Sequence, residues 1–429
     1  MKIAIVGGGG VRIPLLVNGL TGSDLPIDEI ALFDHDVERL RAMLRVARRC
    51  SSVVHACDTA RACVADASFV FFTIRVGGIA ARAADEAESI AHGVAGQETV
   101  GPAGFAMAMR TIPRAVEYAQ LVAAEAPHAW VISFTNPVGI VTQAMLDGSA
   151  ARVIGICDTP TELFEDAAHA AGVSSAACRF DYFGLNHLGW LREIWCDGSP
   201  QLARVWDDDE RLRGIYRAPL FEPAFLRRLR LLPTEYCFFY YEPERALRNM
   251  RAAGTTRGSV IATLDERLFA ALARPDADER IVYEQYLAER SGGYMQLESG
   301  ARAPIAPSPW AALTGYDKIA LRVVRAIHFD SGDMIPLNVR NGASMPDLDA
   351  ADVVEVPCEV GAAGAQPTVA GPMPASVRDL VQRVKAYERL TVRAATTRAA
   401  DDVVRALASN PLVNDADLAA RLAATLRLW

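Results

Sequence analysis

The feature that most constrains the fold is the beginning of the chain, MKIAIVGGGG, in which a short apolar segment runs straight into four glycines. Residues 2–6 predict a buried strand, and residues 14–20 suit a helix after the glycines. Glycine lets the backbone approach a pyrophosphate closely, and the N-terminus of a helix favours its negative charge. This order predicts a dinucleotide site, with contacts from the turn and the residues after it: Gly7, Gly9, Gly10, Val11 and Arg12.

Two details of this motif bear on the cofactor. The third glycine of the G-x-G-x-x-G pattern is absent, since Arg12 and Ile13 occupy that region, so a turn that binds no cofactor stays an alternative. Asp34 ends a second apolar strand about 24 residues after Gly10, where a carboxylate is expected to hold ribose hydroxyls. Asp34 favours NAD, whereas three basic residues keep NADP open: Arg12, Arg39 and Arg41.

Strands and helices alternate through the first part of the chain, with further buried strands expected at 68–73, 130–134 and 153–156. This pattern predicts an α/β fold with a Rossmann-like, doubly wound parallel sheet. A chain of 429 residues favours two domains. We place an NAD-binding domain at 1–165 and an α+β domain for substrate, metal and oligomerisation at 166–429. In the latter we expect a strand at 180–184, a surface loop at 361–374 and closing helices at 374–408 and 414–429.

Charge, hydropathy and cysteine content indicate what kind of protein this is. The net charge of −8 argues weakly against nucleic acid as a partner. No apolar run is long enough for a membrane helix, and the N-terminus has no secretory signal, so we expect a cytoplasmic protein. The eight cysteines show no C-x-x-C spacing. In a reducing compartment we expect them to be mostly small, buried apolar residues.

Several polar residues follow the predicted strands, where ligands bind in doubly wound sheets. Arg75 lies in a glycine-ended segment after one strand, and Asn136 follows another. Arg82 suits either a phosphate contact or an ion pair with Glu86 one helical turn away. The glycine-rich run 96–104, which contains Glu98, is either a plain loop or a binding loop.

A thiol, an imidazole and a group of tyrosines add a different chemistry. Cys157 ends a predicted strand, and His187 follows the strand at 180–184. Each is a candidate metal ligand, although a buried structural role is the simpler reading of either residue alone. Tyr236, Tyr240 and Tyr241 suggest an aromatic cluster, and a tyrosine acts as a base only when a cation lowers its pKa.

Taken together, these segments resemble glycoside hydrolase family 4, the NAD- and metal-dependent glycosidases, and most closely its 6-phospho-β-glucosidase branch. The resemblance covers nearly the whole chain. The matching motifs include GQETVGPAGFAMAMRTIP (96–113), FTNPVGIV (134–141), GICDTP (155–160), GLNHLGW (184–190), LPTEYCFFYY (232–241) and TRG (256–258).

The resemblance implies a redox route to glycoside cleavage. NAD oxidises C3 of the sugar, a base removes the C2 proton, the aglycone leaves, water adds, and the cofactor returns its hydride. It also implies a divalent metal, usually Mn²⁺, and an α+β second domain resembling that of lactate and malate dehydrogenases. By motif, Tyr236 is the base, with Tyr240 and Tyr241 in reserve. The expected metal ligands are Cys157 and His187, the cofactor contacts include Arg75, and the substrate contacts are Arg82, Glu98, Asn136, Asn186 and Arg290.

The chain departs from the family pattern at four positions, mostly around the expected substrate end: Gly10, Thr234, Ser259 and Ser291. Substrate identity is therefore less constrained than reaction type, and another glycoside, phosphorylated or not, stays open. Two further alternatives are an NAD-dependent 2-hydroxyacid dehydrogenase and a non-catalytic protein that senses NAD and sugar phosphate. We also expect a homodimer or homotetramer.

Overall fold

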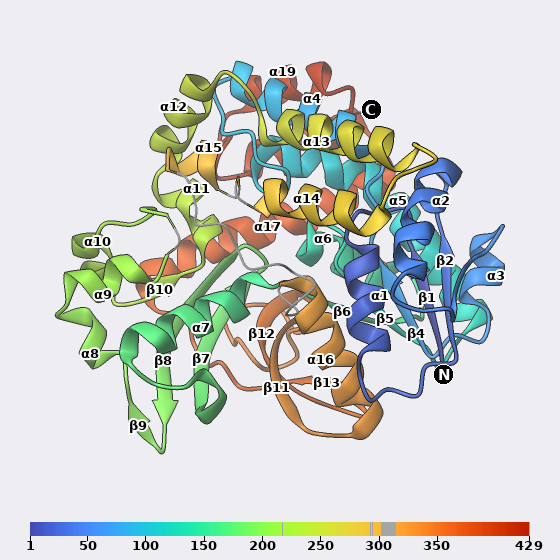
Figure 1. Ribbon diagram of the computed structural model, residues 1–429. Coiled ribbons are helices and arrows are strands. Elements are labelled where there is room, and N and C mark those ends of the chain that lie inside the picture. The colour runs from blue at the N-terminus through green and yellow to red at the C-terminus, as the bar shows by residue number, and fades with distance from the viewer. Residues whose placement is uncertain (217, 292, 294, 302–314, 429) are drawn as a thin grey trace.

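The computed structural model describes residues 1–216, 218–291, 293, 295–301 and 315–428, and one large sheet organises it (Figure 1). In this described part, nine strands lie in the order β13-β12-β11-β6-β5-β4-β1-β2-β3. The order 3-2-1-4-5-6 within it is that of a Rossmann-like sheet, so the predicted α/β fold is confirmed. The strands of this portion are parallel: β1 (Lys2–Val6), β2 (Glu29–Phe33), β3 (Val54–Ala56), β4 (Phe69–Phe72), β5 (Trp130–Ser133) and β6 (Arg152–Gly155).

Both faces of the parallel portion are covered, which explains its uninterrupted apolar strands. Successive residues of a strand point to opposite faces. Accordingly, Ile3 and Ile5 join one hydrophobic core, whereas Ala4 and Val6 join a second core. The helices between and directly after these strands are α1 (Ile13–Thr21), α2 (Val37–Arg48), α3 (Ala60–Val64), α4 (Gly78–Ala91), α5 (Gly101–Glu125), α6 (Val138–Gly148) and α7 (Thr159–Ala171).

Three strands from the far end of the chain extend this sheet. β11 (Asp333–Arg340) pairs antiparallel with β6, with Asn338 opposite Gly155, and β12 (Val353–Gly361) and β13 (Gly364–Pro367) follow. The predicted surface loop at 361–374 was therefore wrong over 364–367, where the chain is a strand paired with β12. Because the chain returns to the first sheet, the boundary at about residue 165 stays a prediction.

A second, smaller sheet supplies the other side of the site. It contains the hairpin β7 (Cys178–Leu185) and β8 (Leu188–Cys196), with β10 (Leu232–Pro233) and β9 (Ser199–Pro200) beside β8, shown in green in Figure 1. Asn186 and His187 form the turn of the hairpin. At its open end Cys178 lies opposite Cys196, and the two form a disulfide. This pair departs from the expectation of small, buried apolar cysteines.

The rest of the described chain is largely helical. No helix within the described residues is long and apolar enough to span a membrane. The short 3₁₀ helices are η1 (Ser175–Ala177) and η2 (Glu235–Cys237). The remaining helices are α8 (Ala203–Trp206), α9 (Asp209–Gly214), α10 (Pro223–Leu229), α11 (Phe238–Tyr241), α12 (Pro243–Ala253), α13 (Arg257–Leu272), α14 (Glu279–Ser291), α15 (Gln296–Ser299), α16 (Tyr316–Phe329), α17 (Ala375–Thr397), α18 (Ala400–Ser409) and α19 (Ala416–Thr425).

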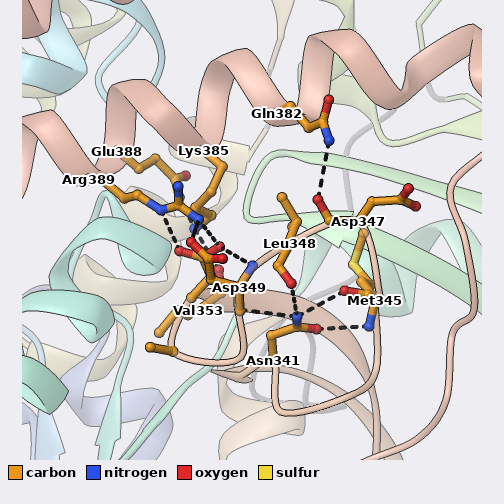
Figure 2. Close-up of polar contacts among 12 residues, drawn as sticks. Asn341, Met345, Asp347, Leu348, Asp349, Val353, Gln382, Lys385, Glu388 and Arg389 are labelled. Carbon is orange, nitrogen blue, oxygen red and sulfur yellow. Dashed lines mark hydrogen bonds and ion pairs between the residues drawn. The ribbon is translucent and has the colours of Figure 1, made fainter.

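Polar contacts fasten helix α17 to the connection between β11 and β12 (Figure 2). The buried Lys385 donates to the Val353 carbonyl over 2.6 Å and pairs with Glu388. Arg389 binds the Asp349 carboxylate of the same connection at 2.5 Å. A buried ammonium is stable only with such partners. Since α17 also packs on α5, these contacts tie the end of the chain to the first sheet.

Candidate active site

A cavity of about 1690 Å³ lies along the carboxyl ends of the parallel strands. Gly7 follows β1, Asp34 follows β2 and Asn136 follows β5, and all three line it. Tyr236 reaches it from the second part of the chain. This edge is where doubly wound sheets bind ligands. The structure brings these predicted site residues together in its wall: Gly7, Gly9, Gly10, Val11, Arg12, Asp34, Arg75, Arg82, Glu98, Asn136, Tyr236 and Arg290.

The glycine turn forms a close-packed cradle at one end of the cavity. Gly7 has a φ of +99°, and a Cβ there would lie 2.1 Å from the Thr73 carbonyl oxygen. Only glycine fits this approach between β1 and the segment after β4. The Gly9 N–H donates to Asp34 over 2.9 Å, which fixes the carboxylate at the end of β2 beside the turn. The donor set and the space therefore fit a dinucleotide.

The three arginines that kept NADP open have other partners. Arg39 pairs with Asp265 at 3.1 Å, and Arg41 pairs with Glu38 at 2.6 Å. Burial alone would lower the pKa of the Arg12 guanidinium, but the neighbouring carboxylates of Asp317 and Asp158 raise the pKa overall. With these guanidiniums engaged by carboxylates, the arrangement favours NAD.

The cavity wall also contains four arginines, and we call Arg75, Arg82, Arg257 and Arg290 the arginine cluster. Arg82 binds Glu86 at 2.7 Å and Glu98 at 2.8 Å, and Arg75 binds Glu98 at 2.5 Å. Burial would raise the pKa of Glu98, but Arg75 and Arg82 instead lower it to about 2. The ion pair expected between Arg82 and Glu86 is therefore present, and Arg82 also faces the cavity.

Arg257 is a member of the cluster that the sequence analysis did not assign, although its TRG motif was visible. Its guanidinium donates to the Arg290 carbonyl over 2.7 Å, and Arg290 donates to the Tyr286 hydroxyl over 2.9 Å. Burial lowers the pKa of Arg257, and the positive charges of Arg290 and Arg82 lower it further. Within the described ranges neither Arg257 nor Arg290 forms an ion pair with a carboxylate, so both suit an anionic ligand.

The two predicted asparagines differ in position. Asn136 lines the cavity, and within the described part of the chain its buried Oδ1 has no hydrogen-bond partner, so it can accept from a ligand hydroxyl. The Asn186 amide instead donates to Glu355 over 3.1 Å. Asn186 borders a separate cavity of about 20 Å³ and is not part of the large cavity wall. Its role as a substrate contact stays a prediction.

His187 lies directly behind the cavity wall. Its imidazole stacks on the Tyr236 ring, with centroids 3.8 Å apart and planes 8° apart. Burial lowers the pKa of His187 to about 3, so the ring is neutral. Its Nε2 is buried and has no hydrogen-bond partner among the residues that the structure describes. A neutral ring with an unused nitrogen at a cavity wall is what a metal ligand requires.

Cys157 follows β6 and immediately precedes Asp158, which lines the cavity. Burial raises the pKa of the thiol well above its ordinary value, and the carboxylates of Glu355 and Asp158 raise it further. A bound cation would stabilise the thiolate. Among the described residues no group of three or more His, Cys, Asp or Glu side chains could hold a metal ion. A site with fewer protein ligands leaves positions open for substrate, as catalytic metal sites do.

Of the three tyrosines, Tyr236 alone belongs to the wall of the large cavity, where it is 9% exposed. Tyr240 borders the small cavity, and burial raises its pKa well above the ordinary value. Tyr241 accepts a hydrogen bond from the Trp190 indole over 3.2 Å. The geometry therefore favours Tyr236 as the reacting tyrosine.

Comparison with known proteins places this site in a family. The Family 4 glycosyl hydrolase model matches residues 2–173, and the Family 4 glycosyl hydrolase C-terminal domain model matches residues 182–413. A probable 6-phospho-beta-glucosidase of Bacillus subtilis (strain 168) is 30% identical, over 96% of this chain and 92% of the relative.

Solved structures of similar proteins support the same family. The 6-phospho-beta glucosidase from Thermotoga maritima, solved with manganese, NAD+ and glucose-6-phosphate, has a TM-score of 0.82 and 27% identity, over 99% of this chain and 97% of that one. Malate dehydrogenase from Plasmodium falciparum shares the fold, with a TM-score of 0.53 and 13% identity over 92% of this chain and 99% of that one. Matches to both family models, over most of the described site, make this chain a member of glycoside hydrolase family 4.

Proposed function

We propose that the protein hydrolyses 6-phospho-β-glucosides and that it uses NAD and a divalent cation, Mn²⁺ being the best candidate. One observation carries the proposal: a single cavity joins a dinucleotide cradle, the His187–Tyr236 stack and the arginine cluster. The relatives in Bacillus subtilis and Thermotoga maritima carry the 6-phospho-beta-glucosidase name, and the latter was solved with manganese, NAD+ and glucose-6-phosphate. An ordinary hydroxyacid dehydrogenase needs no such combination.

Different residues hold the cofactor, the cation and the sugar. When bound, the cofactor supplies a reversible hydride acceptor for C3 of the sugar, and the cation supplies a Lewis acid beside the carbonyl that results. Cys157 and His187 hold the cation. Gly7 and Asp34 hold the dinucleotide, and the Asn136 oxygen orients a sugar hydroxyl.

Tyr236 is positioned to remove the C2 proton, which the neighbouring carbonyl acidifies. Its ring is fixed against His187, and the positive charge of Arg82 lies near enough to interact with it. A nearby cation favours the phenolate. Loss of the C2 proton then expels the aglycone from C1. Water would add at C1 as a proton returns to C2, and return of the hydride to C3 would complete the hydrolysis with no net change in the cofactor. No carboxylate pair is required, which is a known exception among glycosidases.

The arginine cluster provides the selectivity for a 6-phosphate. Arg82 is shared with Glu86 and Glu98, whereas Arg257 and Arg290 retain charge for a ligand. Arginine binds phosphate bidentately, so two such residues discriminate strongly against an unphosphorylated sugar. A homodimer or homotetramer and a cytoplasmic location stay predictions.

The test is hydrolysis of an aryl 6-phospho-β-D-glucoside with NAD+, Mn²⁺ and a thiol reductant, each omitted in turn. We expect aryl release that requires NAD+ and Mn²⁺ and produces no net NADH. The unphosphorylated glycoside serves as the matched substrate and should react far more slowly. Net NADH from a 2-hydroxyacid, without aryl release, would instead establish the dehydrogenase. Faster cleavage of the unphosphorylated sugar would move the assignment to another glycoside.

A further inference from the structure

The loop before helix α5 makes a contact with His187 that the proposed reaction leaves unexplained. The Thr99 hydroxyl lies 2.6 Å from His187 Nδ1. The same hydroxyl lies 2.7 Å from Gln97 Oε1. Gln97 is 6% exposed and His187 is 4% exposed, so the chain from Gln97 through Thr99 to His187 starts and ends in the protein interior.

The donors around Gln97 determine the direction of the hydrogen bonds between Gln97, Thr99 and His187. Gln97 Oε1 accepts from the backbone N–H groups of Thr99 and Val100, over 2.7 and 2.8 Å. An amide nitrogen cannot accept, so this atom is the oxygen. The Thr99 hydroxyl must then donate its single hydrogen to Gln97. Its oxygen is left to accept from the imidazole, which places the hydrogen of His187 on Nδ1.

The other imidazole nitrogen follows from this assignment. A neutral imidazole carries one N–H, so Nε2 of His187 carries the lone pair. That Nε2 is buried and has no hydrogen-bond partner in the structure. A neutral imidazole whose Nε2 carries the lone pair is the form in which histidine binds a metal.

The backbone on either side of Gln97 and Thr99 is closely packed. A Cβ at Gly96 would lie 2.2 Å from the Glu86 carbonyl oxygen, and a Cβ at Gly104 would lie 2.4 Å from the Thr99 carbonyl carbon. Glycine at these positions lets the loop fold tightly between helices α4 and α5. His187 itself has a φ of +63°, an uncommon conformation for a residue with a side chain. Such conformations cluster at functional sites, where the surroundings enforce them.

We propose that Gln97 and Thr99 are positioning residues that hold His187 in its Nδ1–H tautomer, so that Nε2 is presented to the catalytic cation. The inference rests on the proposed role of His187 as a metal ligand. It assigns a function to Gln97 and Thr99, the two polar residues of the GQETVG motif to which the proposed reaction gave none. Without the hydroxyl, the ring has no acceptor for its Nδ1–H, and the tautomer that blocks Nε2 becomes populated.

The decisive measurement determines the tautomer of His187 in the metal-free protein. Long-range ¹H–¹⁵N spectra of histidine-labelled protein distinguish Nδ1–H from Nε2–H, and loss of the signal in His187→Gln assigns it. We expect the Nδ1–H form in the wild type, a mixture in Thr99→Val, and recovery of the Nδ1–H form in Thr99→Ser. Thr111→Val is the control, because Thr111 is a buried threonine whose hydroxyl has no hydrogen-bond partner among the described residues.

The second measurement is Mn²⁺ affinity from the electron paramagnetic resonance signal of the free ion. We expect the dissociation constant to rise ~10–100-fold in Thr99→Val, the range seen when an outer-shell partner is removed. Thr99→Ser and Thr111→Val should bind Mn²⁺ as the wild type does. An Nε2–H signal in the wild type would overturn the proposal, as would an unchanged tautomer and affinity in Thr99→Val. Undiminished affinity in His187→Gln would instead refute the metal assignment itself.

Discussion

The carboxylate of Glu98 lies between two guanidiniums, so removing its charge tests the electrostatics of the arginine cluster. Glu98→Gln keeps the shape of the side chain and mimics the protonated acid. Burial would raise the pKa of Glu98, but Arg75 and Arg82 lower it from the ordinary 4.5 to about 2. The gap between these two pKa values corresponds to about 3 kcal/mol of folding stability at neutral pH.

The sign of the pH dependence follows from the lowered pKa. A carboxylate with a depressed pKa in the folded state stabilises the protein above its unfolded pKa, and this contribution is lost as the pH falls toward the folded pKa. The window for Glu98 therefore runs from 4.5 down to about 2. We expect the free energy of unfolding of the wild type to exceed that of Glu98→Gln by about 3 kcal/mol at neutral pH. Near pH 3 the difference should be only about 1 kcal/mol.

Urea denaturation followed by circular dichroism measures this difference at each pH. Glu38→Gln is the control, because Glu38 is 82% exposed and pairs with Arg41 on the surface. Such pairs contribute less than about 1 kcal/mol. The reasoning is refuted if Glu98→Gln and Glu38→Gln destabilise equally at neutral pH. It is also refuted if the Glu98→Gln difference does not shrink in acid.

Three further substitutions test the separate parts of the site. Gly7→Ala should weaken NAD+ binding at least ~10-fold, because the Thr73 carbonyl leaves no room for a Cβ; unchanged affinity by calorimetry would contradict the cradle. Tyr236→Phe should slow aryl release ~100–10,000-fold, the usual worth of a general base, without weakening Mn²⁺ binding; an equal loss in Tyr240→Phe would contradict the assignment. Arg257→Met should raise KM for the phosphorylated glycoside ~10–100-fold and leave KM for the unphosphorylated one unchanged; an equal rise for both would remove the phosphate role.

The parallel half of the sheet could be predicted because its signals are local. Each strand there is a short apolar run followed by a turn and a helix, and the glycines after β1 fix the direction of the chain. β11 carries no such signal of its partner. It pairs with β6 from the other end of the chain, and their register rests on Asn338 opposite Gly155. β13 begins at Gly364 in a stretch whose composition suggests a loop, and only its pairing with β12 makes it a strand.

Site residues were predictable where a strand end determined their position. Asn136 and Asp34 follow buried strands, and both reach the cavity. The position of Asn186 could not be predicted in this way, because it lies in a tight turn, where consecutive side chains point in different directions. Its neighbour His187 meets Tyr236, whereas Asn186 meets Glu355. The disulfide between Cys178 and Cys196 likewise depends on hairpin register, which the spacing of the cysteines does not reveal.

The ion pairs within the arginine cluster determine which of its arginines can bind a phosphate. Arg82 is held by two carboxylates, and Arg75 shares one of them. A phosphate dianion near Arg82 would therefore meet Glu98, which stays ionised because its pKa lies at about 2. Arg257 and Arg290, in the described part of the chain, are free of carboxylate ion pairs and repel one another. An anion placed between them relieves that repulsion, so selectivity for a phosphorylated sugar should depend on these two residues more than on Arg82.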